Sequence, residues 1–197
     1  MHITASLVKQ LREKTGAGMM DCKKVLTETD GDLDKATKKL REQGLAKAAK
    51  RATKAANEGS ITAYIHPGDK LGVLVEINCE TDFVARTDDF KQFCKNIAMQ
   101  CAATNPLVIQ REELDQELIN KEKEIYKTQA LNEGKPEKII DKIINGKIEK
   151  YFQEVVLIEQ SFIKDQDKTI EDILTDLIAR LGENIQIKRF IRYRLGE

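Results

Sequence analysis

The sequence has no tryptophan, only three prolines and two histidines, and aromatic residues make up 5% of it. It has no apolar run long enough to cross a bilayer, so a membrane-spanning protein is not expected. Basic and acidic residues each number 33, and this zero net charge argues against nucleic acid as the main ligand. The first residues show neither a secretory signal nor a transit peptide, so we expect a cytoplasmic location.

Side chains suited to catalysis or metal binding are also scarce. His2 is terminal and His66 falls in a predicted turn, and neither stands in a recognised nucleophile motif. The cysteines form no C-x-x-C pair and lie in apolar patterns: Cys22, Cys79, Cys94 and Cys101. We expect buried free thiols rather than zinc ligands or disulfides. The sequence therefore predicts neither an enzyme nor a bound cofactor.

The N-terminal part of the chain has helical periodicity. It predicts three short helices that end near Thr15, Asp30 and Gly44, the third capped by an aspartate. Met19 and Met20 fall in the connection between the first two helices, where we expect them to be exposed. Flexible thioethers adapt well to a partner's surface, although filling a core is the commoner role of methionine.

Residues 46–56 are rich in alanine and lysine and predict a basic helix that acts as a linker. A basic run of this size can mark nucleic-acid binding. No aromatic residues are interleaved for base stacking, so a solvated helix face is the favoured interpretation. Residues 57–60 then mark a boundary, and we predict two domains, 1–55 and 56–197.

The second domain is predicted to mix strands and helices. Alternating apolar residues indicate strands at 61–65 and 71–79, joined by a turn at 66–69, and a third strand at 184–195. We expect these strands to form one small antiparallel sheet. With its packed helices, the chain is predicted to belong to the α+β class.

Four helices are predicted in this domain. One is capped by Thr87 and ends before Pro106, and another covers 169–181. Residues 112–131 and 137–152 predict two long helices joined by a tight turn, which form a protruding antiparallel hairpin at about 111–152. Its facing apolar residues are predicted to be Leu114, Leu118, Ile125, Ile139, Ile140, Ile143 and Ile144.

The most informative stretch follows the second predicted strand. Thr81 and Asp82 have turn and capping chemistry, yet apolar Phe83 and Val84 come next, where a loop should be polar. An acid beside an aromatic at such a corner can offer charge to a polar site and insert an apolar wedge into a pocket. The commoner roles remain open, because a phenylalanine there usually joins the core and an aspartate usually caps a helix.

Two stretches, Leu11–Leu26 and Glu76–Arg86, resemble signatures of the bacterial-type elongation factor Ts family, and the resemblance extends over essentially the whole chain. The family is the guanine-nucleotide exchange factor for elongation factor Tu (EF-Tu). The resemblance implies a three-helix domain like the ubiquitin-associated (UBA) domain at 1–55. It also implies an α+β core at 56–197, with a protruding antiparallel coiled coil at about 111–152.

The resemblance also implies residue roles and a mechanism. The factor would bind EF-Tu in its GDP-bound and nucleotide-free states, disturb the Mg²⁺ site and promote GDP release without covalent chemistry. The residues implied to dislodge Mg²⁺ from EF-Tu are Thr81, Asp82, Phe83 and Val84. The residues implied to dock on EF-Tu are Arg12, Met19 and Met20.

Longer family members carry two related core subdomains, and this chain has room for one. It is similar to the short, dimeric members, which implies a homodimer. The terminal strand has no cysteine to cross-link, so we expect a non-covalent dimer. A competing hypothesis is a binding module without exchange activity, which serves as a chaperone or scaffold.

Overall fold

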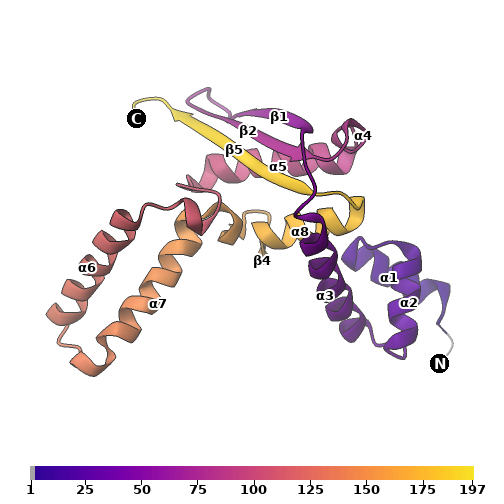
Figure 1. The fold of residues 1–197 in the computed structure, drawn as a ribbon, viewed down its shortest axis with the longest axis horizontal. Helices are drawn as coiled ribbons and strands as arrows, with labels where there is room; N and C mark the ends of the chain where they lie inside the picture. The colour runs from indigo at the N-terminus through magenta and orange to yellow at the C-terminus, as the bar shows by residue number, and fades with distance from the viewer. Residues whose placement is uncertain (1–2) are drawn as a thin grey trace. The chain divides into compact units, whose positions relative to one another are not determined.

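The computed structural model describes residues 3–197. In this part of the chain, eight α-helices accompany a three-stranded sheet and a two-stranded sheet, which confirms the predicted α+β class (Figure 1). None of the described helices is both long and apolar enough to cross a membrane. The chain divides into two compact units. The first comprises the described part of Met1–Thr62, Val75–Asn96 and Asp172–Lys188, and the second comprises Ala63–Leu74, Ile97–Glu171 and Arg189–Glu197.

The first unit begins with the three predicted helices. They are α1 (Ala5–Thr15), α2 (Met19–Glu28) and α3 (Leu33–Arg51). Thr4 caps α1 by accepting a hydrogen bond from the Leu7 N–H, and Asp32 caps α3. Their small shared core is built from Val8, Leu11, Cys22, Val25, Leu26 and Ala36. These residues recur at helical spacing in the sequence, which is why each helix turns one apolar face to the shared core.

The predicted end of the third helix is wrong. Helix α3 continues through Gly44 to Arg51, so most of the predicted linker belongs to the same helix. Gly44 is buried, and a Cβ placed on it would lie 3.5 Å from the Ala179 Cβ. The glycine therefore marks a close approach between two helices rather than a helix end. Alanine and lysine, both strong helix formers, carry the helix onward.

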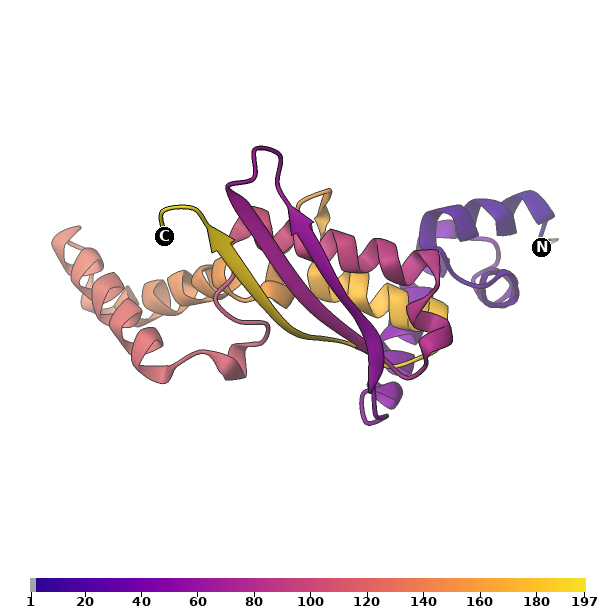
Figure 2. The same ribbon diagram turned by 90° about the horizontal axis from the view of Figure 1, so that it is seen from above.

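The main sheet contains β1 (Glu58–Ile65), β2 (Leu71–Cys79) and β5 (Ile185–Arg194), in the order β1-β2-β5 (Figure 2). Strand β1 begins three residues earlier than predicted, so the predicted boundary at 57–60 overlaps it. Along β2, Val73, Val75, Ile77 and Cys79 are buried, as the alternation predicted.

Two helices frame the end of β2. Helix α4 (Asp82–Ala85) is a single turn, and α5 (Asp88–Thr104) follows it. The Thr87 hydroxyl accepts a hydrogen bond from the Phe90 N–H at 3.3 Å, which confirms the predicted cap of α5. The apolar residues that recur at helical spacing along α5 are all buried: Phe90, Phe93, Cys94, Ile97 and Cys101. Helix α8 (Ile170–Leu181) matches its prediction within one residue.

The second unit contains the helical hairpin. It consists of α6 (Gln116–Asn132) and α7 (Glu137–Val155), which lie side by side (Figure 1). Residues 112–113, predicted as helix, belong to the 3₁₀ turn η1 (Arg111–Glu113). The Asp115 carboxylate accepts a hydrogen bond from the Glu117 N–H at 2.9 Å, and this cap sets the later start of α6.

The predicted facing residues of the hairpin are only partly correct. Ile125 and Ile139 are 47% and 43% exposed, whereas Ile119 and Ala130 belong to the buried cluster. Leu114 is buried but precedes α6, so the helical phase cannot be extended from it. The buried face of α6 is therefore displaced by about one residue from the predicted face.

A short segment was not predicted. It contains the 3₁₀ turn η2 (Leu157–Glu159) and the antiparallel pair β3 (Ser161–Phe162) and β4 (Asp165–Thr169). The strands are short and mostly exposed, and β4 is entirely polar, so they lack the apolar alternation that identifies longer strands.

Candidate functional site

The candidate site is the corner at which β2 passes into α4. Cys79 ends β2 in the core, and its thiol donates a hydrogen bond to the Thr81 carbonyl at 3.1 Å. Thr81 is the N-cap of α4, and its hydroxyl accepts a hydrogen bond from the Val84 N–H at 3.4 Å. The predicted capping chemistry therefore belongs to Thr81, and Asp82 is the first helical residue rather than the cap.

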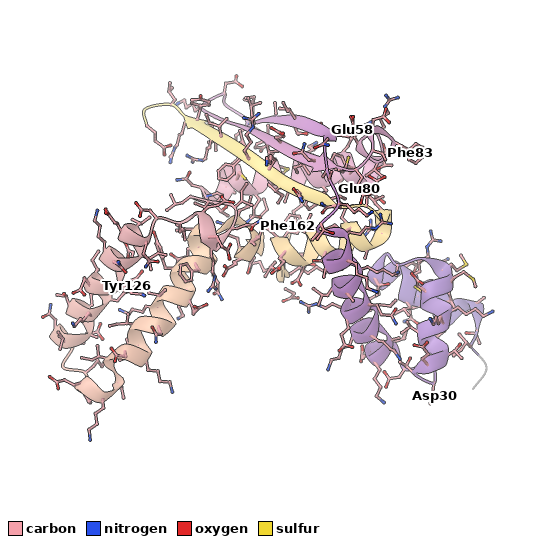
Figure 3. The ribbon with its side chains drawn as sticks, viewed as in Figure 1. Asp30, Glu58, Glu80, Phe83, Tyr126 and Phe162 are labelled. Atoms are coloured by element: carbon pink, nitrogen blue, oxygen red, sulfur yellow. The ribbon has the colours of Figure 1, made fainter. Side chains whose placement is uncertain are left out.

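Phe83 and Val84, the two apolar residues of this corner, lie in opposite environments. The Phe83 side chain is 78% exposed, whereas Val84 is 5% exposed. Figure 3 shows the Phe83 ring pointing away from α4. The interpretation of Phe83 as a core residue is wrong, and Val84 is the residue that fastens the turn to the core.

The acidic residue of the corner has a neighbour of opposite charge. The Arg86 guanidinium donates a hydrogen bond to the Asp82 carboxylate at 2.7 Å, and both side chains are largely exposed. Exposed pairs of this kind contribute little to stability. Breaking the Asp82–Arg86 pair would therefore cost little folding free energy.

Residues distant in the sequence also form hydrogen bonds with this corner, and no sequence pattern predicts them. The Glu183 carboxylate accepts hydrogen bonds from the Thr81 N–H at 3.0 Å and from the Thr81 hydroxyl at 2.7 Å. The adjacent Glu80 carboxylate, labelled in Figure 3, accepts a bond from the Asn184 N–H at 2.7 Å and pairs with Arg51 at 3.3 Å. No sequence signal indicates contacts between residues more than one hundred positions apart.

The predicted docking residues form a second group, on α1 and α2. Arg12 is exposed on α1. Met19 and Met20 are 58% and 76% exposed, as expected, but they form the first turn of α2 rather than a connection. Gly18 precedes them in an extended conformation at the N-cap position. Two unbranched thioethers thus stand side by side on the surface of the three-helix bundle.

These two groups offer apolar contact from Phe83, Met19 and Met20, beside the exposed charges of Asp82 and Arg12. Within residues 3–197, no three or more His, Cys, Asp or Glu side chains are placed to hold a metal ion. The four cysteines are buried and free, as predicted. Burial raises the pKa of Cys79 to about 11, so this thiol next to the corner is protonated at neutral pH. An exposed ring on a fixed turn and an exposed methionine pair are features of a binding surface.

Comparisons with known proteins give one consistent family. A family model described as Elongation factor TS matches residues 2–197. The chain is 60% identical over 195 residues to Elongation factor Ts of Heliobacterium modesticaldum, and 61% identical over 195 residues to that of Syntrophomonas wolfei. Each alignment covers 99% of this chain and 91% of the relative.

A third relative, Elongation factor Ts of Desulfosudis oleivorans, is 57% identical over 99% of this chain and 98% of its own length. These matches define a translation elongation factor, and the α+β fold is consistent with them. The chain belongs to the elongation factor Ts family.

Proposed function

We propose that the protein is a guanine-nucleotide exchange factor that binds GDP-bound EF-Tu, disturbs its Mg²⁺ site and promotes GDP release, so that GTP can rebind. The observation that carries the proposal is the Phe83 ring, 78% exposed beside a buried Val84. An exposed aromatic ring on a rigid turn is suited to enter an apolar pocket of a partner. Membership of the elongation factor Ts family supports the choice of EF-Tu.

The mechanism follows from reciprocal coupling of binding. If the protein binds nucleotide-free EF-Tu more tightly than GDP-bound EF-Tu, it must weaken the binding of GDP to EF-Tu to the same extent. Phe83 inserts between helices of EF-Tu. Asp82 breaks its ion pair with Arg86 and interacts with the polar network beside the metal. Weakened Mg²⁺ coordination leaves the phosphate charge less neutralised, and GDP dissociates faster.

All of this is binding chemistry. We propose that the protein is not an enzyme in the covalent sense and needs no cofactor of its own. Thr81 and Val84 hold the turn in shape, and Phe83 and Asp82 act on the partner. We place this activity in the cytoplasm, where translation takes place.

We further propose that residues 1–55 form a UBA-like domain that docks on EF-Tu through Arg12, Met19 and Met20. Residues 56–197 then form the core, and the hairpin at about 111–152 is its antiparallel coiled coil. The end of α3 at Arg51 and the start of β1 at Glu58 support a division in this region.

The basic character of α3 supports a protein partner over nucleic acid. Several of its cations already pair with carboxylates of the same unit: Lys39 with Glu28, Arg41 with Asp172, Lys47 with Asp21, and Arg51 with Glu80. A cation that is neutralised within the protein releases fewer counterions on binding phosphates. We therefore propose no direct nucleic-acid binding and no membrane binding.

We also propose a non-covalent homodimer. In the second unit, Ile65, Leu74, Tyr193 and Leu195 are 59%, 46%, 66% and 77% exposed, and they line one hollow. A two-fold interface places the same apolar surface on both subunits, so a second copy can cover it. Sedimentation at micromolar concentration should give a dimer for the native chain and a monomer for Tyr193→Asp.

The central test is GDP release. EF-Tu loaded with a fluorescent GDP analogue is mixed with excess unlabelled GDP and a substoichiometric amount of the factor, and release is followed by stopped-flow fluorescence. We expect a rate that rises with factor concentration and several turnovers per factor molecule. Binding to EF-Tu without any acceleration would favour the competing scaffold hypothesis.

A further inference from the structure

The turn after α8 contacts the Phe83 corner through one side chain. Helix α8 ends at Leu181, and Gly182 follows it with a φ of +74°, which suits glycine and turns the chain toward Glu183. Both Glu183 carboxylate oxygens are used on one residue, because Oε2 accepts from the Thr81 N–H and Oε1 from the Thr81 hydroxyl. Two bonds to the N-cap residue fix the rotation of α4 as well as its position.

The next residue ties the same turn to the end of α3. The Asn184 side chain is 2% exposed, and its amide donates hydrogen bonds to the Lys54 carbonyl at 2.7 Å and the Ala52 carbonyl at 3.5 Å. Its backbone N–H donates to Glu80. Two consecutive residues therefore hold the Phe83 corner and the segment that leaves the proposed docking domain.

We propose that Glu183 is a positioning residue for nucleotide exchange, because it fixes Thr81 and thereby presents the Phe83 ring in one orientation. The neighbouring Asn184 keeps that orientation constant relative to the end of α3. The inference rests on the proposed exchange function. It assigns to Glu183 no contact with the partner, only the orientation of a residue that makes one.

Because the contact between Thr81 and Glu183 lies at the surface, its loss should change the orientation of α4 more than the stability of the whole protein. The hydrogen bonds between Thr81 and Glu183 are solvent-exposed, so water can replace them when Glu183 is truncated. Val84 still fastens the turn to the core. Loss of Glu183 should therefore loosen α4 locally while the rest of the protein stays folded.

The test uses the full chain and five variants. Glu183→Ala removes both acceptors, whereas Glu183→Gln keeps an oxygen for the Thr81 N–H and offers an N–H to the Thr81 hydroxyl. Phe83→Ala and the double variant complete a cycle. Glu133→Ala removes an exposed acid in the hairpin turn, which pairs with Lys135, and serves as the charge-matched control.

Two readouts are measured. In the GDP-release assay, we expect Glu183→Ala to lower the maximal rate about tenfold with an unchanged half-saturating concentration, because two charge-assisted hydrogen bonds are lost and water partly replaces them. In the free protein, hydrogen exchange at the Val84 and Ala85 amides, both bonded to Thr81, should become about tenfold faster. The thermal midpoint should stay within about 2 °C.

The supporting results are specific. Glu183→Gln should retain most of the native rate, Glu133→Ala should match the native protein, and the double variant should be no slower than Phe83→Ala. If the rate losses of the two single variants multiply in the double variant, Glu183 acts independently of Phe83. That result would overturn the proposal. So would a Gln variant as poor as the Ala variant, or unchanged amide exchange in Glu183→Ala.

Failure of the proposed function gives a different result. If the native protein does not accelerate GDP release, the exchange function is wrong whatever the variants do. The hydrogen-exchange readout needs no EF-Tu, so it still decides whether Glu183 fixes the corner.

Discussion

Phe83 and Val84 are adjacent in the sequence and have opposite environments, with 78% and 5% of their surfaces exposed. The single helical turn α4 makes this possible, because successive residues of a helix point about 100° apart. Val84 thus holds the turn against the core, and Phe83 remains exposed to solvent.

Phe83→Ala should slow GDP release without unfolding the protein. The ring is exposed and does not pack in the core of the protein, so the thermal midpoint of the variant should stay at the native value. If the ring is the main contact in the partner's pocket, the maximal release rate should fall about 10- to 30-fold. Stopped-flow fluorescence measures the rate, and an unchanged rate would remove the wedge from the mechanism.

The matched control is Val84→Ala, one residue along. Val84 is buried, so the loss of two methyl groups should lower the free energy of unfolding by about 1–3 kcal/mol. Urea unfolding compares the two variants. The contrast tests whether the two side chains have separate roles.

Replacing Met19 and Met20 together by alanine should weaken docking and leave exchange intact. These residues lie on α2 and not on the corner, so saturating factor should still give the native maximal rate. The half-saturating concentration should rise about tenfold, since two exposed apolar contacts are lost. Leu45→Ala, at a 48% exposed position on α3, serves as the control. A fall in the maximal rate instead would place the methionines in the exchange step.

Two glycines should respond oppositely to alanine. Gly44 lies within α3, and a Cβ there meets the Ala179 Cβ at an ordinary 3.5 Å, so Gly44→Ala should stabilise the protein by about 0.5–1 kcal/mol. Gly16 has a φ of +67°, and its Cβ would lie 2.6 Å from the Arg180 guanidinium. Gly16→Ala should destabilise it by about 1 kcal/mol or more. Thermal unfolding gives both signs, and a destabilised Gly44→Ala variant would contradict the account of α3.

Stability should fall at alkaline pH. Burial raises the pKa of Cys94 and Cys101 to about 12, compared with about 8.5 in an unfolded chain. The folded state thus keeps protons that the unfolded state releases. The free energy of unfolding must therefore decrease as pH rises from about 8.5 toward 12.

Urea unfolding at pH 8 and pH 10 measures this effect. Cys101→Ala removes one of the two thiols, and its stability should fall less between these pH values than that of the native protein. An equal fall in both proteins would assign the pH dependence to other groups.

Sequence periodicity predicted most of the elements because their buried stripes are regular. The stripe of α5 and the alternation of β2 needed no tertiary information. Where an apolar residue precedes the helix, as Leu114 does, the phase was lost. Gly44 predicts a helix end wrongly, because a glycine at a helix–helix contact has the same local sequence signal as a glycine that ends a helix.

The corner can be predicted from its own residues, but the contact with Glu183 that holds it cannot. Thr81 to Val84 combine capping chemistry with misplaced apolar side chains, and both signals are local. Glu183 follows a helix-ending glycine and has no pattern of its own; its role depends on a contact with Thr81 across 102 positions. Such a contact arises from the fold and leaves no trace in neighbouring residues.

The unbroken course of α3 bears on how the N-terminal bundle can be isolated. A fragment cut at the predicted stop near Gly44 would lose two helical turns, together with Lys47, whose ammonium pairs with Asp21 at 3.0 Å. A fragment that extends to Arg51 keeps the whole helix and this link.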